Sequence, residues 1–328
     1  MSLDRSLVLR ARLLLVLAAV LWSLGSVFMR LLREPLGVGL HEPPLTPLQI
    51  AFYRGLFGGL VMLALVKRTE ITFRPGMFGM VVAFTVMSSL YLSALGLGPA
   101  ANAIFLQNTA PLWVFVFVVV LFRERGDRRG WETVLLGTVG AIVIVAGNWP
   151  RNLPIDEQKT QILILLMGMG SGIVYAIVVL FLRMLCDNSP AWLVALNLLG
   201  TAFTLGFFVL LNDGANEFGR WVSTPSLFQL VVLVVFGGFQ MAIPYWLFAR
   251  GLRTVPAPEA AVITLIEPLL NPVWAYLITP EKDTPNIWML GGGGFILFAL
   301  IWRYVPTSAT PVPDGNNNAE LKRDNRRE

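Results

Sequence analysis

The chain has 328 residues, of which 55% are hydrophobic and only 14% charged, and its formal net charge at pH 7 is +5. Because a soluble domain usually carries about 25% charged residues, this composition excludes a soluble globular protein and indicates an integral membrane protein. With one cysteine, Cys186, and one histidine, His41, the chain can form no internal disulfide and holds no cluster of metal ligands. We therefore expect neither a metal site nor a cofactor.

Ten apolar runs are long enough, or nearly so, to cross a bilayer, which takes roughly 20 residues of helix. In chain order they are Leu13–Leu32, Pro47–Val66, Pro75–Leu97, Ala100–Phe122, Trp131–Gly147, Ile162–Leu185, Pro190–Leu211, Leu227–Ala249, Pro258–Ile278 and Asn286–Tyr304. We expect all ten to be α-helices, because backbone polar groups in hydrocarbon must hydrogen-bond within their own segment. The first run would also suit a signal peptide, but we favour a retained span, since cleavage would leave the repeat described next incomplete.

One stretch of the chain occurs twice. Residues Pro99 to Glu124 read PAANAIFLQNTAPLWVFVFVVVLFRE, and residues Pro256 to Glu281 read PAPEAAVITLIEPLLNPVWAYLITPE. Their register pairs Pro111 with Pro268 and ends each copy on a glutamate. Such internal duplication in a membrane chain is typical of transporters built from structural repeats.

The two halves are expected to be inverted repeats, because five spans per half is an odd number. Most of the 25 Lys and Arg residues lie in connections on the side of the N-terminus, including RERGDRR after the fourth span, whereas its counterpart PEKDTP after the ninth is slightly acidic. Basic connections mark the cytoplasmic side, so both termini are predicted to be cytoplasmic. The predicted parts are a cytoplasmic N-terminus (1–12), a first five-helix repeat (13–147), an external linker (148–161), a second repeat (162–304) and a disordered cytoplasmic tail (305–328).

Each half carries a small-residue entry to its fourth span, a proline within that span and a glutamate just beyond it. With the segments quoted above, and with YLSALGLGPAANA and its counterpart FARGLRTVPAPEA, the chain resembles EamA-type members of the drug/metabolite transporter superfamily from about Leu13 to Tyr304. The resemblance implies a central cavity lined by spans one to four and six to nine. Spans five and ten would lie outside it as scaffold and as a possible homodimer contact. Pro280, directly before Glu281, departs from the pattern and predicts an early end to the ninth span.

Three prolines are predicted to break helices within the membrane: Pro111, Pro244 and Pro268. A proline leaves the carbonyl four residues earlier without its donor, and unpaired backbone at this depth is tolerated where it lines a cavity. One interpretation is a polar ring around a solute, made of Gln107, Asn108, Gln240 and Thr264. The alternative is a set of kinks that only helps the two halves to move.

Arg54 lies within the second span, roughly 10 Å along the helix axis. An unpaired arginine there costs at least about 2.5 kcal/mol, so it should face the protein interior and have a partner. It could anchor a carboxylate or phosphate of the solute. Alternatively, it reaches outward or ties spans together through carbonyl groups or Glu42.

Glu267 is the other ionisable residue expected to be buried within a span. Thr264, Glu267 and Asn271 are spaced three and four residues apart and are expected to share one face of the ninth span. Because burial favours the neutral carboxyl, Glu267 is a candidate proton-coupling site or a counter-charge to a solute amine. The alternative is a structural glutamate beside Pro268.

Several aromatic residues within the spans could contact a solute, namely Trp22, Tyr91, Tyr175 and Tyr245, or could serve only in packing. We interpret the protein as a secondary transporter in the cell inner membrane, with a small-molecule solute and the lipid bilayer as its partners and no nucleic acid. The resemblance favours export by alternating access but does not supply a substrate. Arg54 and Glu267 in one cavity would suit the two ends of an amino acid or a related amphipathic solute. A drug or organic-cation transporter, a nucleobase or sugar transporter and a non-transporting sensor or scaffold remain alternatives. We expect no enzyme activity, because the sequence offers no catalytic residues of a recognisable kind.

Overall fold

The computed structural model describes residues 2–151 and 153–305, and within these ranges the chain is helical with no strand. Ten of its helical segments are long and apolar enough to cross a membrane, which confirms the predicted all-α membrane fold. Six spans are single helices: α3 (Pro47–Leu65), α4 (Pro75–Leu97), α7 (Arg128–Gly147), α8 (Ile155–Met184), α9 (Pro190–Ser223) and α15 (Ile287–Tyr304).

The other four spans are interrupted. Span one consists of α1 (Ser2–Ser23) and α2 (Gly25–Arg33), span four of α5 (Ala100–Gln107) and α6 (Ala110–Leu121), span eight of α10 (Leu227–Val235), a π-helix η2 (Phe236–Ala242) and α11 (Ile243–Gly251), and span nine of α12 (Ala257–Thr264) and α13 (Ile266–Ile278). Two short helices, η1 (Arg68–Glu70) and α14 (Pro280–Asp283), lie in connections. The predicted tail from residue 306 onward lies outside the described residues.

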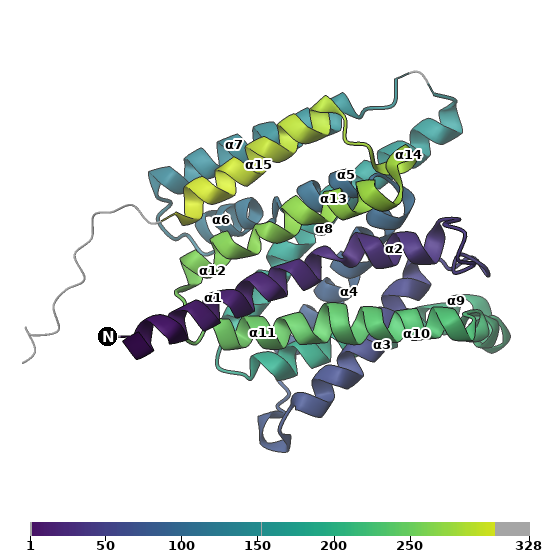
Figure 1. The fold of residues 1–328 in the computed structure, drawn as a ribbon, viewed down its shortest axis with the longest axis horizontal. Helices are drawn as coiled ribbons and strands as arrows, with labels where there is room; N and C mark the ends of the chain where they lie inside the picture. The colour runs from purple at the N-terminus through teal and green to yellow at the C-terminus, as the bar shows by residue number, and fades with distance from the viewer. Residues whose placement is uncertain (1, 152, 306–328) are drawn as a thin grey trace, which may run out of the picture.

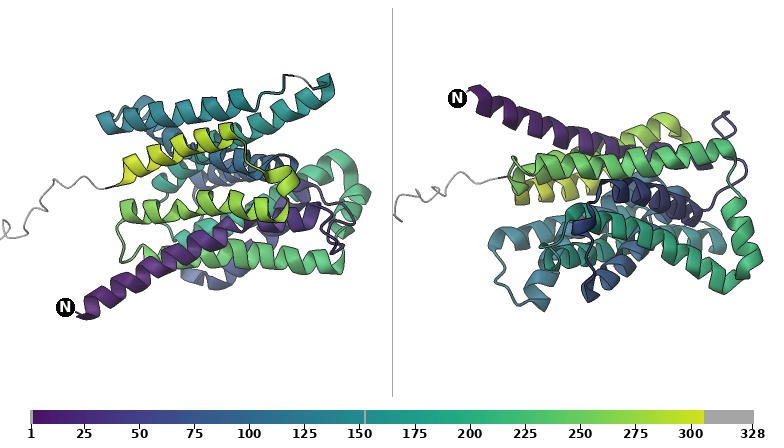
Figure 2. Two further views of the ribbon diagram at one scale, coloured as in Figure 1. Left: turned by 45° about the horizontal axis from the view of Figure 1, so that its top comes forward. Right: turned by 90° about the horizontal axis from the view of Figure 1, so that it is seen from below.

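The spans lie side by side, and α1 begins at the end of the bundle where α15 finishes (Figure 1). We call this the terminal end, and the opposite end, where α2 finishes and α14 lies, the far end. The helix α8 runs toward the terminal end, whereas α1 and α2 run away from it (Figures 1 and 2). The first spans of the two halves therefore run in opposite directions, and the inverted-repeat relation of the halves as a whole stays a prediction.

Several helices are longer than the sequence predicted. The helix α1 already begins at Ser2, and α8 begins at Ile155, within the predicted external linker. The helix α9 continues to Ser223 beyond a kink at Gly214, whose φ of +84° suits glycine. The segment after the kink packs against α3, where the ring centroids of Trp221 and Phe52 lie 5.1 Å apart. This contact favours continuation of the helix.

The helices α7 and α15 pack against each other at the edge of the bundle (Figure 1). They approach closely at a pair of glycines, since a Cβ added at Gly140 would lie 2.5 Å from the carbonyl oxygen of Gly292. Small residues permit such contacts between helices in lipid, where apolar side chains gain little by leaving the bilayer. The peripheral position fits a scaffold role, and the homodimer through these two spans stays a prediction.

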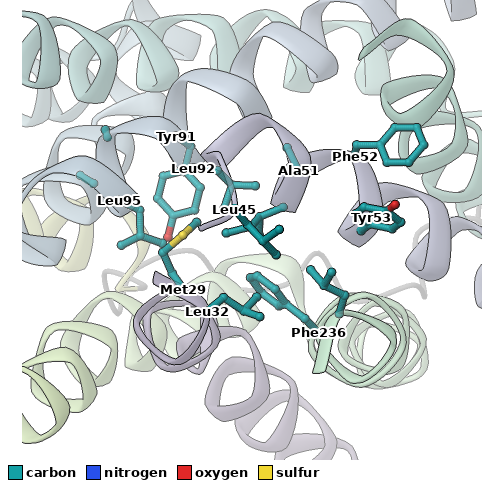
Figure 3. Packing of buried hydrophobic residues seen from close by; sticks show 14 of the residues in the cluster. Met29, Leu32, Leu45, Ala51, Phe52, Tyr53, Tyr91, Leu92, Leu95 and Phe236 are labelled. Carbon is teal, nitrogen blue, oxygen red and sulfur yellow. The ribbon is translucent and has the colours of Figure 1, made fainter. Parts of the chain in front are cut away.

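The main apolar core lies among α2, α3, α4 and η2. Figure 3 shows Met29 and Leu32 of α2 facing Tyr91 and Leu95 of α4, with Phe236 of η2 beside them. This packing fixes α2 against α4 and the π-helix.

Candidate functional site

Spans four and nine break at matching places. Helix α5 ends at Gln107 and α12 ends at Thr264, residues that the sequence repeat pairs with each other. In both spans the break lies just before the repeated proline, Pro111 or Pro268. The early end predicted for span nine is also observed, because α13 ends at Ile278 and Pro280 begins the separate short helix α14.

The third predicted proline, Pro244, follows the π-helix of span eight. A π-helix lets the chain accommodate the missing donor while it changes the register of the side chains. Its glycine Gly237 packs directly on α3, where an added Cβ would lie 2.6 Å from the backbone nitrogen of Gly58 and 2.8 Å from the carbonyl oxygen of Arg54. The π-helix therefore sits immediately against the backbone that carries the buried arginine.

The break in span one, at Leu24, was not predicted. Three contacts from spans eight and nine hold it: Gln240 Nε2 donates to Trp22 O at 2.8 Å, the backbone nitrogen of Ser26 donates to Asn271 Oδ1 at 3.2 Å, and Trp274 Nε1 donates to Ser23 Oγ at 2.9 Å. A signal was present in the sequence, because Gly and Ser together often mark a sharp helix kink and residues 23–26 read SLGS.

Arg54 is 6% exposed and faces the protein interior. Its Nη2 donates to Ser88 Oγ at 3.0 Å, and its guanidinium lies over the ring of Phe236, 5.5 Å from the centroid. In the described part of the chain no carboxylate pairs directly with it, and Glu42 instead lies beside His41. The predicted interior orientation is thus observed, while the suggested tie to Glu42 is wrong because Glu42 lies in a connection and pairs there.

Glu267 lies in the first turn of α13 and interacts electrostatically with Arg54. The two do not touch, since no ion pair between them occurs among the described residues. In the part of the chain that the structure describes, Arg54 and Glu267 have no side-chain nitrogen or oxygen atom that is both fully buried and without a hydrogen-bond partner. Their unbonded nitrogen and oxygen atoms therefore keep some accessible surface, and the two opposite charges lie on different spans.

The four residues of the predicted polar ring have unequal roles. Asn108 Nδ2 donates to Ile104 O at 2.8 Å and Thr264 Oγ1 donates to Ala261 O at 2.9 Å, so each binds the carbonyl of a preceding turn. Gln240 holds the break of span one, as described above. Gln107 is partly exposed, and its Nε2 lies 3.4 Å from the sulfur of Met87.

The expected common face of span nine is also divided. Thr264 ends α12, whereas Glu267 and Asn271 belong to α13 beyond the break at Leu265. Asn271 is completely buried against Ser26, while Glu267 keeps some accessible surface. Of the three residues of the expected face, Asn271 is therefore taken up by contacts within the protein, whereas Glu267 is only partly buried.

Three of the four aromatic candidates lie near Glu267. Tyr91, Tyr175 and Tyr245 each interact electrostatically with Glu267. Trp22 packs edge-on against Tyr245, with ring centroids 5.1 Å apart, and Tyr175 is 36% exposed although it lies deep within α8. The structure thus gathers Arg54, Glu267 and the aromatic candidates, and it adds Ser88, which the sequence did not single out.

Helix breaks inside the membrane, together with buried opposite charges on neighbouring spans, are features of a membrane transporter. A profile of the EamA-like transporter family matches residues 9–146 and again residues 162–304. The chain belongs to this family, which confirms the resemblance noted in its sequence.

Curated relatives are transporters too. An uncharacterized transporter of Archaeoglobus fulgidus is 27% identical over 293 residues, covering 88% of this chain and 95% of the relative. The pseudopaline exporter CntI of Pseudomonas aeruginosa is 24% identical over 291 residues, covering 87% and 94%. A protein of known crystal structure matches 89% of this chain and 96% of its own with a TM-score of 0.57 at 16% identity, a likeness of fold alone.

Proposed function

We propose that this transporter moves a small zwitterionic metabolite of the amino-acid type across the inner membrane, in the direction of export, by alternating access. The observation that carries the proposal is the pair of opposite charges, Arg54 and Glu267, which lie on different spans and interact electrostatically without forming an ion pair. Isolated charges within a membrane protein are costly, whereas a solute with a carboxylate and an ammonium group can neutralise both.

The residues around the two charges suit the same solute. Ser88 holds one side of the Arg54 guanidinium, which leaves the rest of its planar donor fork to bind a carboxylate. Trp22 and Tyr245 lie edge-on to each other near Glu267, where they can contact the apolar part of the solute. Export is supported by the family and by the named exporter among the relatives.

A second candidate is a transporter of organic cations. Aromatic faces attract cations, and Glu267 supplies a negative charge beside Tyr175 and Tyr245. In this case Arg54 would be structural, held by Ser88 and Phe236. For either solute the sequence has no ATP-binding motif, so we propose that an ion or solute gradient, or simple facilitation, drives transport and that the protein is no enzyme.

Three solutes of one carbon skeleton separate the two candidates: an amino acid, the amine that lacks its carboxylate, and the acid that lacks its amine. We would measure the thermal unfolding of the purified protein with each at millimolar concentration. A ligand at 100 times its dissociation constant stabilises the folded state by roughly 2.7 kcal/mol. We expect a shift with the amino acid alone, lost in Arg54→Gln and in Glu267→Gln, and then exchange of that solute in liposomes.

A shift with the amine that persists in Arg54→Gln would instead support the organic-cation candidate. The matched control is Arg12→Gln, which removes an exposed arginine that pairs with Glu259 at the terminal end. Retention of the full amino-acid shift in both Arg54→Gln and Glu267→Gln would contradict the two-charge site.

A further inference from the structure

A second group of charges lies at the far end of the bundle, outside the candidate solute site. Arg30, at the end of α2, is completely buried. Its Nε and Nη2 donate to the two oxygens of Asp283 in α14, at 2.7 and 2.8 Å, in a bidentate pair. The Asp283 side chain is itself only 1% exposed. This geometry is among the strongest that an ion pair can adopt.

The pair also binds the backbone of a third segment, the connection between α4 and α5. Arg30 donates to Leu95 O at 3.0 Å and to Gly98 O at 2.8 Å, and the backbone nitrogen of Ala100 donates to Asp283 Oδ1 at 2.7 Å. Spans one, three, four and nine are thereby joined at one point. Opening the far end would have to separate these segments.

An apolar cluster lies beside this ion pair. Met29 and Leu32 of α2 pack in it with Leu95 and Tyr91 of α4 (Figure 3). Met29 is 0% exposed. The far end thus holds a buried salt bridge packed next to apolar side chains.

The terminal end carries a corresponding but exposed pair. Arg183 Nη2 lies 2.7 Å from Glu124 Oε1, and the two side chains are 58% and 46% exposed. Arg30 and Arg183 occupy matching positions in the two halves, and each pairs with an acid from the segment that follows span four or span nine, although the repeat aligns Glu124 with Glu281 rather than with Asp283. An exposed pair contributes little to stability, whereas loss of one partner from a buried pair leaves an uncompensated charge.

We propose that Arg30 and Asp283 are gate residues that close the transport path at the far end, the external side in our proposed orientation. The break at Leu24 lets α2 swing on the rest of span one, and the ion pair holds α2 closed against α14 and the α4–α5 connection. This gate rests on the proposed transport function, because a gate has a role only in a protein whose transport path opens and closes.

The test measures access to Met29 and requires no solute. Met29→Cys is introduced with Cys186→Ser, and a membrane-impermeant maleimide is added to the outside of intact cells that express the full chain. We expect slow labelling with the ion pair intact and labelling at least tenfold faster in Asp283→Asn, which keeps the side-chain shape but removes the charge. Glu124→Gln, which breaks the exposed pair, is the matched control and should leave the rate unchanged.

The double variant Arg30→Gln/Asp283→Asn guards against misfolding, because it leaves no unpaired charge in the buried site. It too should label at least tenfold faster. Equal labelling of either folded variant and the parent would overturn the gate, as would equal acceleration by Glu124→Gln. Failure of the gate can be told from failure of the proposed function. If the proposed function were wrong, solute binding and exchange would be absent while the labelling pattern persisted.

Discussion

At the scale of single residues, the Asp283 carboxylate should stay ionised across the physiological range. Burial alone would raise its pKa, but hydrogen bonds and the charge of Arg30, together with the Ala100 backbone nitrogen, bring the pKa below its ordinary value. A carboxylate with a lowered pKa stabilises the folded state above its unfolded pKa of about 4, and loses this effect only as the pH falls through the lower folded value.

We therefore expect the labelling rate of Met29→Cys, corrected for the reagent's own pH dependence, to be the same at external pH 5.5 and 7.5. The other charged groups around the pair are Arg33, Lys282 and Glu34. Glu34 Oε1 lies 2.5 Å from Lys282 Nζ and 3.7 Å from Arg30 Nη1. Burial lowers the pKa of Lys282, and Glu34 opposes this effect. Asp283→Asn removes the carboxylate and supplies the labelling rate of the open gate as a reference. Faster labelling of the parent at pH 5.5 than at pH 7.5 would instead show that protonation opens the gate.

The residues of the candidate site could be predicted in part. Arg54 and Glu267 stand out because a charged side chain within an apolar span is energetically costly and is usually functional. Ser88 could not be singled out, since serine is common in membrane helices and its role depends on a partner 34 residues away. Asp283 was missed for the same reason, because its partner Arg30 is 253 residues distant and no local pattern joins them.

At the scale of elements, the contact between α3 and the π-helix of span eight should control the position of Arg54. Gly237→Ala would place a methyl group 2.6 Å from the Gly58 nitrogen and 2.8 Å from the Arg54 carbonyl oxygen. Both are backbone atoms, so the helices must separate. Overpacking of this kind costs about 1–3 kcal/mol, and we expect a lower melting temperature together with weaker amino-acid binding.

The control for Gly237→Ala is Gly294→Ala in α15, where an added methyl group would meet nothing within 4 Å. Alanine favours helix more than glycine does, so this variant should be as stable as the parent or slightly more stable. Unfolding temperature and solute affinity are measured for both. Unchanged affinity in Gly237→Ala would show that Arg54 is positioned independently of the π-helix.

The helix breaks were easier to predict where a proline causes them than at Leu24, where a weaker Gly/Ser signal acts together with tertiary contacts. Pro111, Pro244 and Pro268 each lie at the start of a helical segment that follows a break or a π-helix. The break at Leu24 has no proline and depends on amides from spans eight and nine. The extension of α9 was missed because Gly214 and its polar neighbours read as a loop, whereas Phe218 and Trp221 bury their rings together.

At the scale of the whole molecule, the span count and the all-helical fold followed from hydropathy alone, because bilayer thickness sets the length of each apolar run. Helix ends followed less well, since helices continue past the hydrocarbon wherever they pack or are solvated. Orientation is a separate property. It depends on which side holds the basic connections, and the terminal end carries the arginine-rich segment between α6 and α7.

The single native cysteine offers a direct measurement of this orientation. Cys186 is exposed just beyond α8, at the terminal end, while Val38 is 61% exposed in the far-end connection after α2. With the terminal end in the cytoplasm, an impermeant maleimide should label Val38→Cys/Cys186→Ser in intact cells but leave native Cys186 unlabelled until the membrane is permeabilised. Labelling of Cys186 in intact cells, with protection of Val38→Cys, would reverse the orientation and place the Arg30–Asp283 gate on the cytoplasmic side.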